Sequence, residues 1–221
     1  MRTIEDFKNR DYWIIENAQY EKPSFRLRKC AKIVNTIAAD RKCTLLDVGC
    51  GPGSLLRLLR PNVEYYGIDI AIHHPAPYLR EADLAHQPID FEGKRFDFVV
   101  AMGLFEYLGA QHDAKLEEIR EILKDNGKFI LSYINFGHMR RLVWPNYNNI
   151  RQVAQMVQSL NRVFRVERYF PASHHWRQKQ PGKNCLPGLQ MHINYRIPLL
   201  SSLCAVEYFF ICSHRNEKTT A

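Results

Sequence analysis

A glycine-rich turn between two apolar runs constrains this chain more than any other feature. The run CTLLDVG, residues 43–49, predicts a buried strand that ends in a cluster of glycines. The run SLLRLLR, residues 54–60, predicts a helix that Pro61 ends. Glycines in such a turn let the backbone approach a ligand without interference from Cβ atoms. In an open α/β sheet this turn lies at the carboxyl ends of the strands, where ligands bind.

The rest of the chain alternates between predicted strands and helices. Apolar runs predict further strands at 63–70, 95–102, 128–136, 164–170 and 204–213. Helical spacing of apolar residues predicts helices at 24–39, 113–123 and 149–160, with Ser24 as the N-cap of the first. The alternation predicts an α/β fold with a mostly parallel sheet covered on both faces. No helix separates the last two strands, so we expect them to form an antiparallel pair.

The spacing of the three glycines, at 49, 51 and 53, separates two classes of cofactor. A dinucleotide fingerprint is G-x-G-x-x-G, and here Ser54 occupies its sixth position. Asp47, two residues before the first glycine, would repel a pyrophosphate. Its carboxylate suits the cationic sulfonium and ammonium groups of S-adenosylmethionine. In this motif the chain resembles the class I S-adenosylmethionine-dependent methyltransferases, over about residues 30–135.

This resemblance implies a Rossmann-like, doubly wound, mostly parallel seven-stranded sheet with an antiparallel C-terminal strand pair. It also implies one methyltransferase domain over residues 1–221. The expected parts are an N-terminal helical lid or cap (1–42), a cofactor-binding core (43–136), a substrate-side segment and loop (137–203) and a last strand (204–213).

The resemblance also implies where the cofactor binds. Asp69 closes the second strand, where an acid can accept hydrogen bonds from both ribose hydroxyls. Ile70 would pack on the adenine, and Asp83 would bond the adenine amine. Met102 would lie beside the methionine part of the cofactor. The expected cofactor-binding residues are Asp47, Gly49, Cys50, Gly51, Gly53, Asp69, Ile70, Asp83, Leu84, Met102, Gly103 and Phe105.

The turn after the strand 95–102 is expected to face the acceptor. Phe105 and Tyr107 would contact the methyl group or the substrate, or else pack in the core. A general base is needed only when the acceptor atom must lose a proton early. Glu106 and His138 are the expected catalytic residues. Each can instead be a structural polar residue, as can His112, a further candidate.

The N-terminal segment and a basic segment supply the remaining candidate substrate residues. Tyr12 and Trp13 would form an aromatic lid, or a helix packed on the sheet edge. The net charge is +8, and residues 138–183 contain nine Lys or Arg against one acid, which equals the whole excess. Such a segment indicates an anionic substrate or a nucleic acid, although a solvated face would look the same. Arg140 and Arg141 are predicted to bind an anionic group of the acceptor. The long irregular stretch 171–203 is predicted to cover the active site.

Composition and motifs exclude several classes of protein. A hydrophobic content of 46% and a charged content of 24% are typical of a globular protein. No apolar run approaches the roughly 18–20 residues of a membrane span, and Glu5 and Asp6 argue against a signal peptide. We therefore expect a cytoplasmic location and no membrane partner. The six cysteines form no CxxC pair, so free buried thiols are expected, and the histidines show no metal-ligand pattern.

Three functions remain open. The first is an enzyme that transfers a methyl group from S-adenosyl-L-methionine to a small-molecule acceptor with an anionic group, leaving S-adenosyl-L-homocysteine. The second is an RNA or protein methyltransferase, which the basic segment favours. The chain contains no recognisable nucleic-acid module, however, so no nucleic-acid partner is expected. The third is a non-catalytic S-adenosylmethionine-binding protein.

Overall fold

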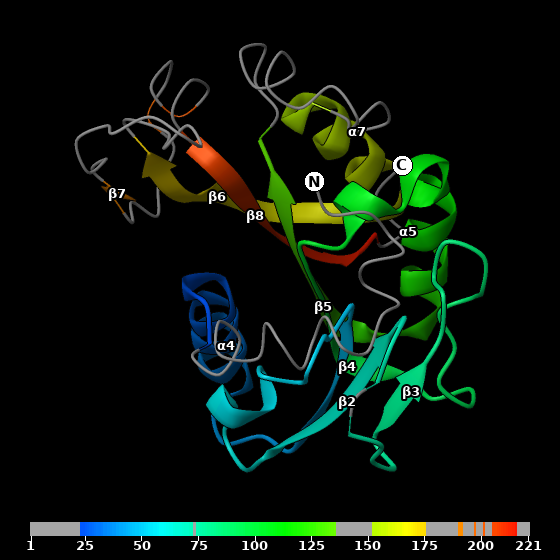
Figure 1. Ribbon diagram of the computed structural model, residues 1–221. Coiled ribbons are helices and arrows are strands. Elements are labelled where there is room, and N and C mark those ends of the chain that lie inside the picture. Colours follow the sequence, from blue (N-terminus) through cyan, green and yellow to red (C-terminus); the bar gives the residue numbers. More distant parts are fainter. Residues whose placement is uncertain are drawn as a thin grey trace, which may run out of the picture.

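The computed structural model describes residues 23–72, 74–135, 152–175, 190–191, 197, 201 and 205–215 (Figure 1). The strands are β1 (Cys43–Val48), β2 (Val63–Asp69), β3 (Leu79–Glu81), β4 (Phe96–Met102), β5 (Leu123–Ile134), β6 (Phe164–His175), β7 (Gln190–Met191) and β8 (Ala205–His214). The α-helices are α4 (Phe25–Ala38), α5 (His112–Ile122) and α7 (Val153–Val163). Three short 3-10 turns are η1 (Leu56–Leu58), η2 (Phe105–Tyr107) and η3 (Gly109–Gln111).

All strands belong to one sheet, in the order β3-β2-β1-β4-β5-β8-β6-β7. The strands from β3 to β5 pair in parallel, whereas β8 is antiparallel to both β5 and β6. The strand order reverses between β1 and β4, so a ligand crevice is expected at their carboxyl ends. The predicted α/β fold class and the antiparallel C-terminal pair are confirmed. The two-residue strand β7 makes the sheet eight-stranded rather than seven-stranded.

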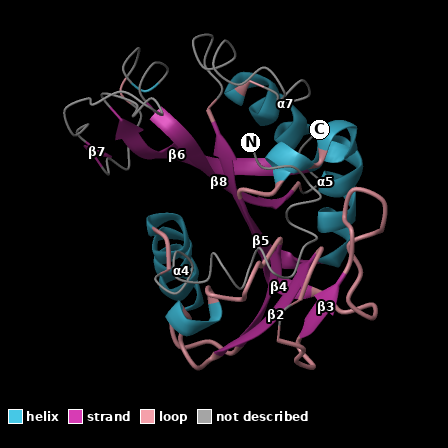
Figure 2. Cartoon of the chain, viewed as in Figure 1, coloured by secondary structure: helices cyan, strands magenta, loops and turns pink. Residues whose placement is uncertain are grey.

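Helices cover both faces of this sheet. Figure 2 shows α4 on one side and α5 with α7 on the other. Leu45 and Leu46, adjacent in β1, are both fully buried because one packs in the cluster under α4 and the other in the cluster under α5 and α7. Burial on both faces explains why the parallel strands are continuous apolar runs.

The first described helix begins as predicted. The Ser24 hydroxyl accepts a hydrogen bond from the Leu27 N–H at 3.3 Å, which satisfies one of the free amides in the first turn of α4. The buried face of α4 then places Cys30 and Val34 against the sheet.

The helix predicted over 54–60 is wrong, because the chain forms only η1 there. The Asn35 side chain of α4 donates from Nδ2 to the Leu58 carbonyl at 2.9 Å and accepts the Arg60 N–H at 3.1 Å through Oδ1. Backbone groups that a helix would pair internally are therefore bonded to α4. Pro61 follows directly and leaves no room for a further turn.

Two strand boundaries also differ from the prediction. β5 begins at Leu123, before its predicted start at residue 128, and so contains the segment 124–127. The insertion appears in the sheet as a register shift, since Phe96 pairs with Leu123 but Phe98 pairs with Lys128. β6 continues to His175, past its predicted end at 170.

Within the described ranges, no helix combines the length and apolar character that crossing a bilayer requires. Four cysteines there are free and buried, namely Cys30, Cys43, Cys50 and Cys212. This confirms the thiol prediction for those four. Cys185 and Cys204 lie outside the described residues.

Candidate active site

The glycine turn after β1 folds across the end of β2. Gly49, Gly51 and Gly53 have φ values of 78°, 53° and 71°, a left-handed backbone that favours glycine. The Gly49 N–H donates to the Ile68 carbonyl at 2.8 Å. A Cβ on Gly49 would lie 3.1 Å from the Leu104 Cβ, so the turn also meets the end of β4. The turn therefore joins three strands at the switch point.

Asp69 ties this turn to the end of β2. One carboxylate oxygen, Oδ2, accepts the Gly51 N–H at 2.7 Å, and the other accepts the Ile70 N–H at 2.7 Å. Burial raises the pKa of Asp69 above its ordinary value, although the backbone N–H groups that donate to it lower the pKa. A carboxylate has about four lone-pair sites, so a fixed Asp69 can still accept from a ligand hydroxyl.

Asp47 is buried beside the turn with one oxygen uncommitted. Its Oδ2 accepts the Tyr65 hydroxyl at 3.0 Å, whereas Oδ1 has no hydrogen-bond partner in the described part of the chain. Burial raises the pKa of Asp47 to about 7, the Tyr65 hydrogen bond lowers it, and the charge of Asp69 raises it. A buried carboxyl oxygen without a partner suits a cationic ligand group.

The segment after β3 lies beside Asp69. The Ala82 N–H donates to the Asp69 carbonyl at 2.7 Å, which brings Asp83 to the same edge of the sheet. Asp83 caps its own turn, since Oδ1 accepts the Ala85 N–H at 3.1 Å. Leu84 is buried in the core. The structure thus gathers the predicted acids Asp47, Asp69 and Asp83 at one edge.

Cys50 explains a glycine whose role was not predicted. A Cβ on Gly67 of β2 would lie 2.9 Å from the Cys50 Sγ and 2.8 Å from the Leu79 Cδ2. Gly67 therefore makes room for the Cys50 side chain beneath the turn. No spacing pattern in the sequence signals this contact.

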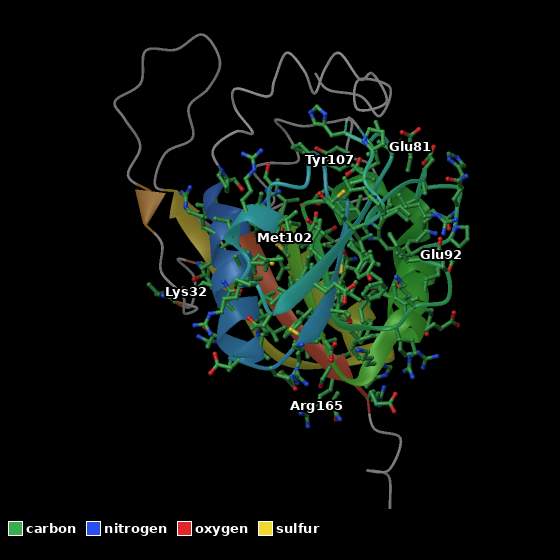
Figure 3. All side chains as sticks on the ribbon, turned by 90° about the horizontal axis from the view of Figure 1, so that it is seen from below. Lys32, Glu81, Glu92, Met102, Tyr107 and Arg165 are labelled. Carbon is green, nitrogen blue, oxygen red and sulfur yellow. The ribbon has the colours of Figure 1, made fainter. Side chains whose placement is uncertain are left out.

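The end of β4 meets an arginine from α4. Gly103 has φ 74°, and a Cβ there would lie 2.0 Å from the Arg26 Nη1. That nitrogen donates to the Met102 carbonyl at 3.4 Å. Figure 3 shows Tyr107 and Glu81 at the edge of the molecule opposite Arg165. Because Glu81 ends β3 and Tyr107 follows β4, this is the edge where the parallel strands end.

Phe105 and His112 pack in the core below this edge. The Phe105 side chain is fully buried, with its ring centroid 5.6 Å from that of His112 and 6.3 Å from that of Phe129. The His112 Nε2 is hydrogen-bonded to the Phe105 carbonyl. These contacts favour structural roles for both side chains, and a cofactor contact of Phe105 stays a prediction.

Glu106 is the predicted catalytic residue that the structure describes. Its Oε1 accepts the Ile134 N–H at 3.0 Å, and its Oε2 is buried without a hydrogen-bond partner among the described residues. Burial raises the pKa of Glu106 to about 7, Arg26 lowers it, and Glu207 raises it. Arg26 in turn pairs with Glu207, with 2.7 Å between Nε and Oε1. Sequence reasoning missed Arg26 and Glu207, which stand in no motif.

Several predicted substrate and catalytic residues lie outside the described residues, namely Tyr12, Trp13, His138, Arg140 and Arg141. Most of the stretch 171–203 lies outside them too. Among the residues that are described, no group of three His, Cys, Asp or Glu side chains is arranged to hold a metal ion.

A family model described as a methyltransferase domain matches residues 23–179, which is more than half of the chain. The chain belongs to the class I S-adenosylmethionine-dependent methyltransferases. The cofactor of this family is S-adenosylmethionine. The described residues of this methyltransferase fit that cofactor, because the uncommitted Asp47 Oδ1 would face a cationic group and Asp69 a ribose.

A curated protein with a similar sequence is also a methyltransferase. The malonyl-[acyl-carrier protein] O-methyltransferase of Acetivibrio thermocellus is 27% identical over 124 residues, which are 49% of this chain and 43% of that protein. The methyltransferase thus matches less than half the length of this curated relative.

Solved structures show the same fold. An S-adenosylmethionine-dependent methyltransferase from Archaeoglobus fulgidus superposes with a TM-score of 0.61 at 15% identity, covering 91% of this chain and 98% of that one. The 1,6-didemethyltoxoflavin-N1-methyltransferase of Burkholderia thailandensis, solved with 1,6-didemethyltoxoflavin and S-adenosylhomocysteine, gives 0.57 at 12% identity. In that comparison the coverage is 98% of this chain and 92% of the other.

Proposed function

We propose that this methyltransferase transfers a methyl group from S-adenosylmethionine to a small-molecule acceptor. The observation that carries the proposal is the buried Asp47 carboxyl with one uncommitted oxygen beside the glycine turn. A small acceptor is supported by the Burkholderia thailandensis enzyme of the same fold, whose structure contains the small molecule 1,6-didemethyltoxoflavin. RNA and protein acceptors, and binding without catalysis, are the alternatives that an assay must separate.

Three described acids have proposed roles in binding the cofactor. When bound, the cofactor supplies an electrophilic methyl group on a sulfonium. Asp47 would offset its positive charge, Asp69 would bind the ribose, and the segment at Asp83 would meet the adenine. Holding the acceptor atom about 3 Å from the methyl carbon, in line with the sulfur, accounts for most of the catalysis in such a displacement.

We further propose that the acceptor bears an anionic group bound by Arg140 and Arg141. The basic segment that contains them begins soon after β5, which ends at the crevice edge. The name of the curated relative supports the idea, because a malonyl group carries a carboxylate. The charges near Glu106 are two carboxyls, Glu106 and Glu207, the Arg26 guanidinium and the Lys29 ammonium, so these residues supply no excess of positive charge. Recognition of an anion therefore rests on the basic segment.

The test uses methyl-radiolabelled S-adenosylmethionine and a cell extract separated by size. Label in the small-molecule fraction supports the proposal, whereas label in RNA or protein contradicts it. No transfer to any fraction, despite tight cofactor binding, indicates a non-catalytic protein. The double variant Arg140→Glu with Arg141→Glu should raise KM for the labelled fraction by at least about tenfold at low salt. Arg162→Glu with Arg165→Glu, a charge reversal in the same basic segment, is the matched control and should leave KM unchanged.

A further inference from the structure

Three charged side chains from distant segments lie near one another at the edge where the parallel strands end. Arg26 comes from α4, Glu106 from the turn after β4, and Glu207 from β8. β8 runs against β5, so Glu207, near its start, pairs with Ile134, the last residue of β5. The Ile134 N–H also donates to Glu106 at 3.0 Å. The reversed strand thus brings a carboxylate to the edge where the parallel strands end.

The two carboxyls are not equivalent. Glu207 forms an ion pair with the Arg26 guanidinium, at 2.7 Å between Oε1 and Nε, although the geometry of this contact is not that of a hydrogen bond. Glu106 accepts one backbone N–H, and its Oε2 is buried with no hydrogen-bond partner in the described ranges. A buried polar atom without a partner is costly, so its retention at a ligand crevice points to a task with the ligand.

Arg26 lies against the end of β4, where the methionine part of the cofactor is expected. Its guanidinium rests against Gly103 and reaches the Met102 carbonyl, both at the end of β4. A Cβ on Gly103 would lie 2.0 Å from the Arg26 Nη1, so the glycine leaves room for Arg26 in this place. The Arg26 side chain is 35% exposed, whereas the side chain of its partner Glu207 is only 3% exposed.

We propose that Arg26 and Glu207 position Glu106 to receive the proton that the acceptor loses, and that the acceptor atom is an O–H or N–H group. This inference rests on the proposed methyl transfer. The acceptor oxygen or nitrogen forms the new bond to the methyl carbon, and the carbon–sulfur bond breaks with its electron pair left on sulfur. The acceptor proton passes to Glu106 Oε2, which must be ionised beforehand, and leaves for solvent after the product.

The charges around Glu106 suit this task. Burial raises the pKa of Glu106, Arg26 on α4 lowers it and Glu207 on β8 raises it, and the net pKa is about 7. Lys29 on α4 and Tyr107 beside Glu106 interact with the same pair, Lys29 with Glu207 and Tyr107 with Arg26. A proton acceptor works best when its pKa lies near the working pH. The methylated atom is thus distinct from the anionic group proposed above, because a carboxylate has no proton to lose.

The first test needs no acceptor. Carbon-13 NMR of protein labelled at the glutamate carboxyls, with Glu106 assigned from the variant Glu106→Gln, should show a titration midpoint near pH 7. Glu207→Gln should lower that midpoint by about one pH unit, because a negative neighbour is lost and Arg26 is released toward Glu106. Arg26→Gln should raise the midpoint, and Arg26→Lys should restore part of the difference. Glu167→Gln is the control. It removes a carboxylate near the start of β6 that pairs with Lys128, and it should leave the Glu106 midpoint unchanged.

The second test follows label transfer from radiolabelled S-adenosylmethionine to the extract fraction that accepts it. Glu106→Gln should lose at least about 100-fold in transfer while cofactor affinity stays within about twofold. Glu207→Gln should shift the acidic limb of the pH–rate profile to lower pH, by the same number of pH units as the NMR midpoint.

Each outcome decides the proposal. Wild-type rates in Glu106→Gln, or a methyl ester as the product, overturn the proton transfer to Glu106. An NMR midpoint that Glu207→Gln leaves in place overturns the positioning by Glu207. If the wild-type protein labels no fraction, the proposed function fails. The NMR midpoints still decide the charge arrangement in that case.

Discussion

The residues proposed to meet the cofactor (the cofactor side) and those proposed to meet the acceptor (the acceptor side) are held in place in different ways. On the cofactor side, Asp47, the glycine turn and Asp69 come from one continuous stretch of two strands and their connection. On the acceptor side, Arg26, Glu106 and Glu207 come from three segments that meet only in the folded protein. Backbone N–H groups hold the Asp69 carboxylate, whereas a guanidinium holds the Glu207 carboxylate.

The first group of residues is held by hydrogen bonds to nearby backbone amides. The second is held by an ion pair between residues far apart in the sequence. A carboxylate bonded to neighbouring amides keeps its place whenever the turn forms. The Arg26–Glu207 pair exists only when α4, β4 and β8 have all docked. We therefore expect changes on the acceptor side to alter proton affinity and rate, and changes on the cofactor side to alter cofactor binding.

The largest expected effect is a loss of stability as the pH rises, to which both sides contribute. Asp47 and Glu106 have pKa values of about 7 in the folded protein, against ordinary values of 3.8 and 4.5. Between these values the folded state binds more protons than the unfolded state, so the free energy of unfolding falls as pH rises toward 7. We expect a fall of about 4 kcal/mol between pH 5 and pH 8, measured by urea unfolding. Asp47→Asn and Glu106→Gln should each remove about half of it, whereas a free energy of unfolding that rises over this range contradicts the burial of both groups.

The second effect concerns cofactor affinity. Asp69→Ala removes the carboxylate that holds the Gly51 N–H and would meet the ribose. We expect S-adenosylmethionine binding to weaken by roughly 1.5–3 kcal/mol in calorimetry, the scale of losing hydrogen bonds to a charged group. Glu106→Gln, on the acceptor side, should leave the affinity within about twofold. Equal losses in the two variants would remove the distinction between the two sides.

The third effect uses two glycines with similar backbone angles. Gly103 and Gly93 have φ values of 74° and 69°, but a Cβ on Gly103 meets Arg26 whereas one on Gly93 has nothing within 4 Å. Gly93→Ala should cost about 1 kcal/mol through backbone strain alone. Gly103→Ala should cost about 2 kcal/mol, because Arg26 must also move away from Glu207. Thermal unfolding of both variants gives the difference, and equal costs would show that Arg26 is not held in place.

The smallest effect tests the support of Asp47. Tyr65→Phe removes the hydroxyl that donates to Asp47 and lowers the pKa of that carboxyl. The pKa of Asp47 should rise, and the free energy of unfolding should fall by about 1 kcal/mol at pH 7. Tyr66→Phe is the control, because its hydroxyl bonds Glu64 on the surface and its loss should change stability by less than about 0.5 kcal/mol. If the two variants are equally stable, Tyr65 does not support Asp47.

The contrast between the sides explains what sequence reasoning achieved. Local spacing was enough to predict the fold class and to identify Asp47 and Asp69 as candidate site residues. The strand, the glycine turn and the acid at the end of the next strand lie close together in the sequence. Arg26 and Glu207 carry no such signal, because the contact depends on the register that sets Glu207 opposite Ile134. The sequence shows Arg26 as one of several basic residues on a helix.

The error at residues 54–60 has the same origin. Four leucines at helical spacing predict a helix, but a side chain from α4 intervenes. The Asn35 amide bonds both Leu58 and Arg60, and this tertiary contact outweighs the local preference. Local patterns therefore predicted β1, β2 and β4 of the parallel sheet but missed the three-residue strand β3. They also failed where another element supplies the hydrogen-bond partner.

The place of β8 in the sheet also determines the order in which this protein can assemble. β8 is the latest of the described strands in the chain, yet it lies between β5 and β6, as Figure 1 shows. During synthesis β5 therefore leaves the ribosome with one edge unpaired, and β6 also has no pairing partner on that side until β8 has been made. An open strand edge is a place where chains associate wrongly, so a nascent or truncated chain without β8 should be prone to aggregate. The Arg26–Glu207 ion pair also forms late in this order, because Glu207 belongs to β8.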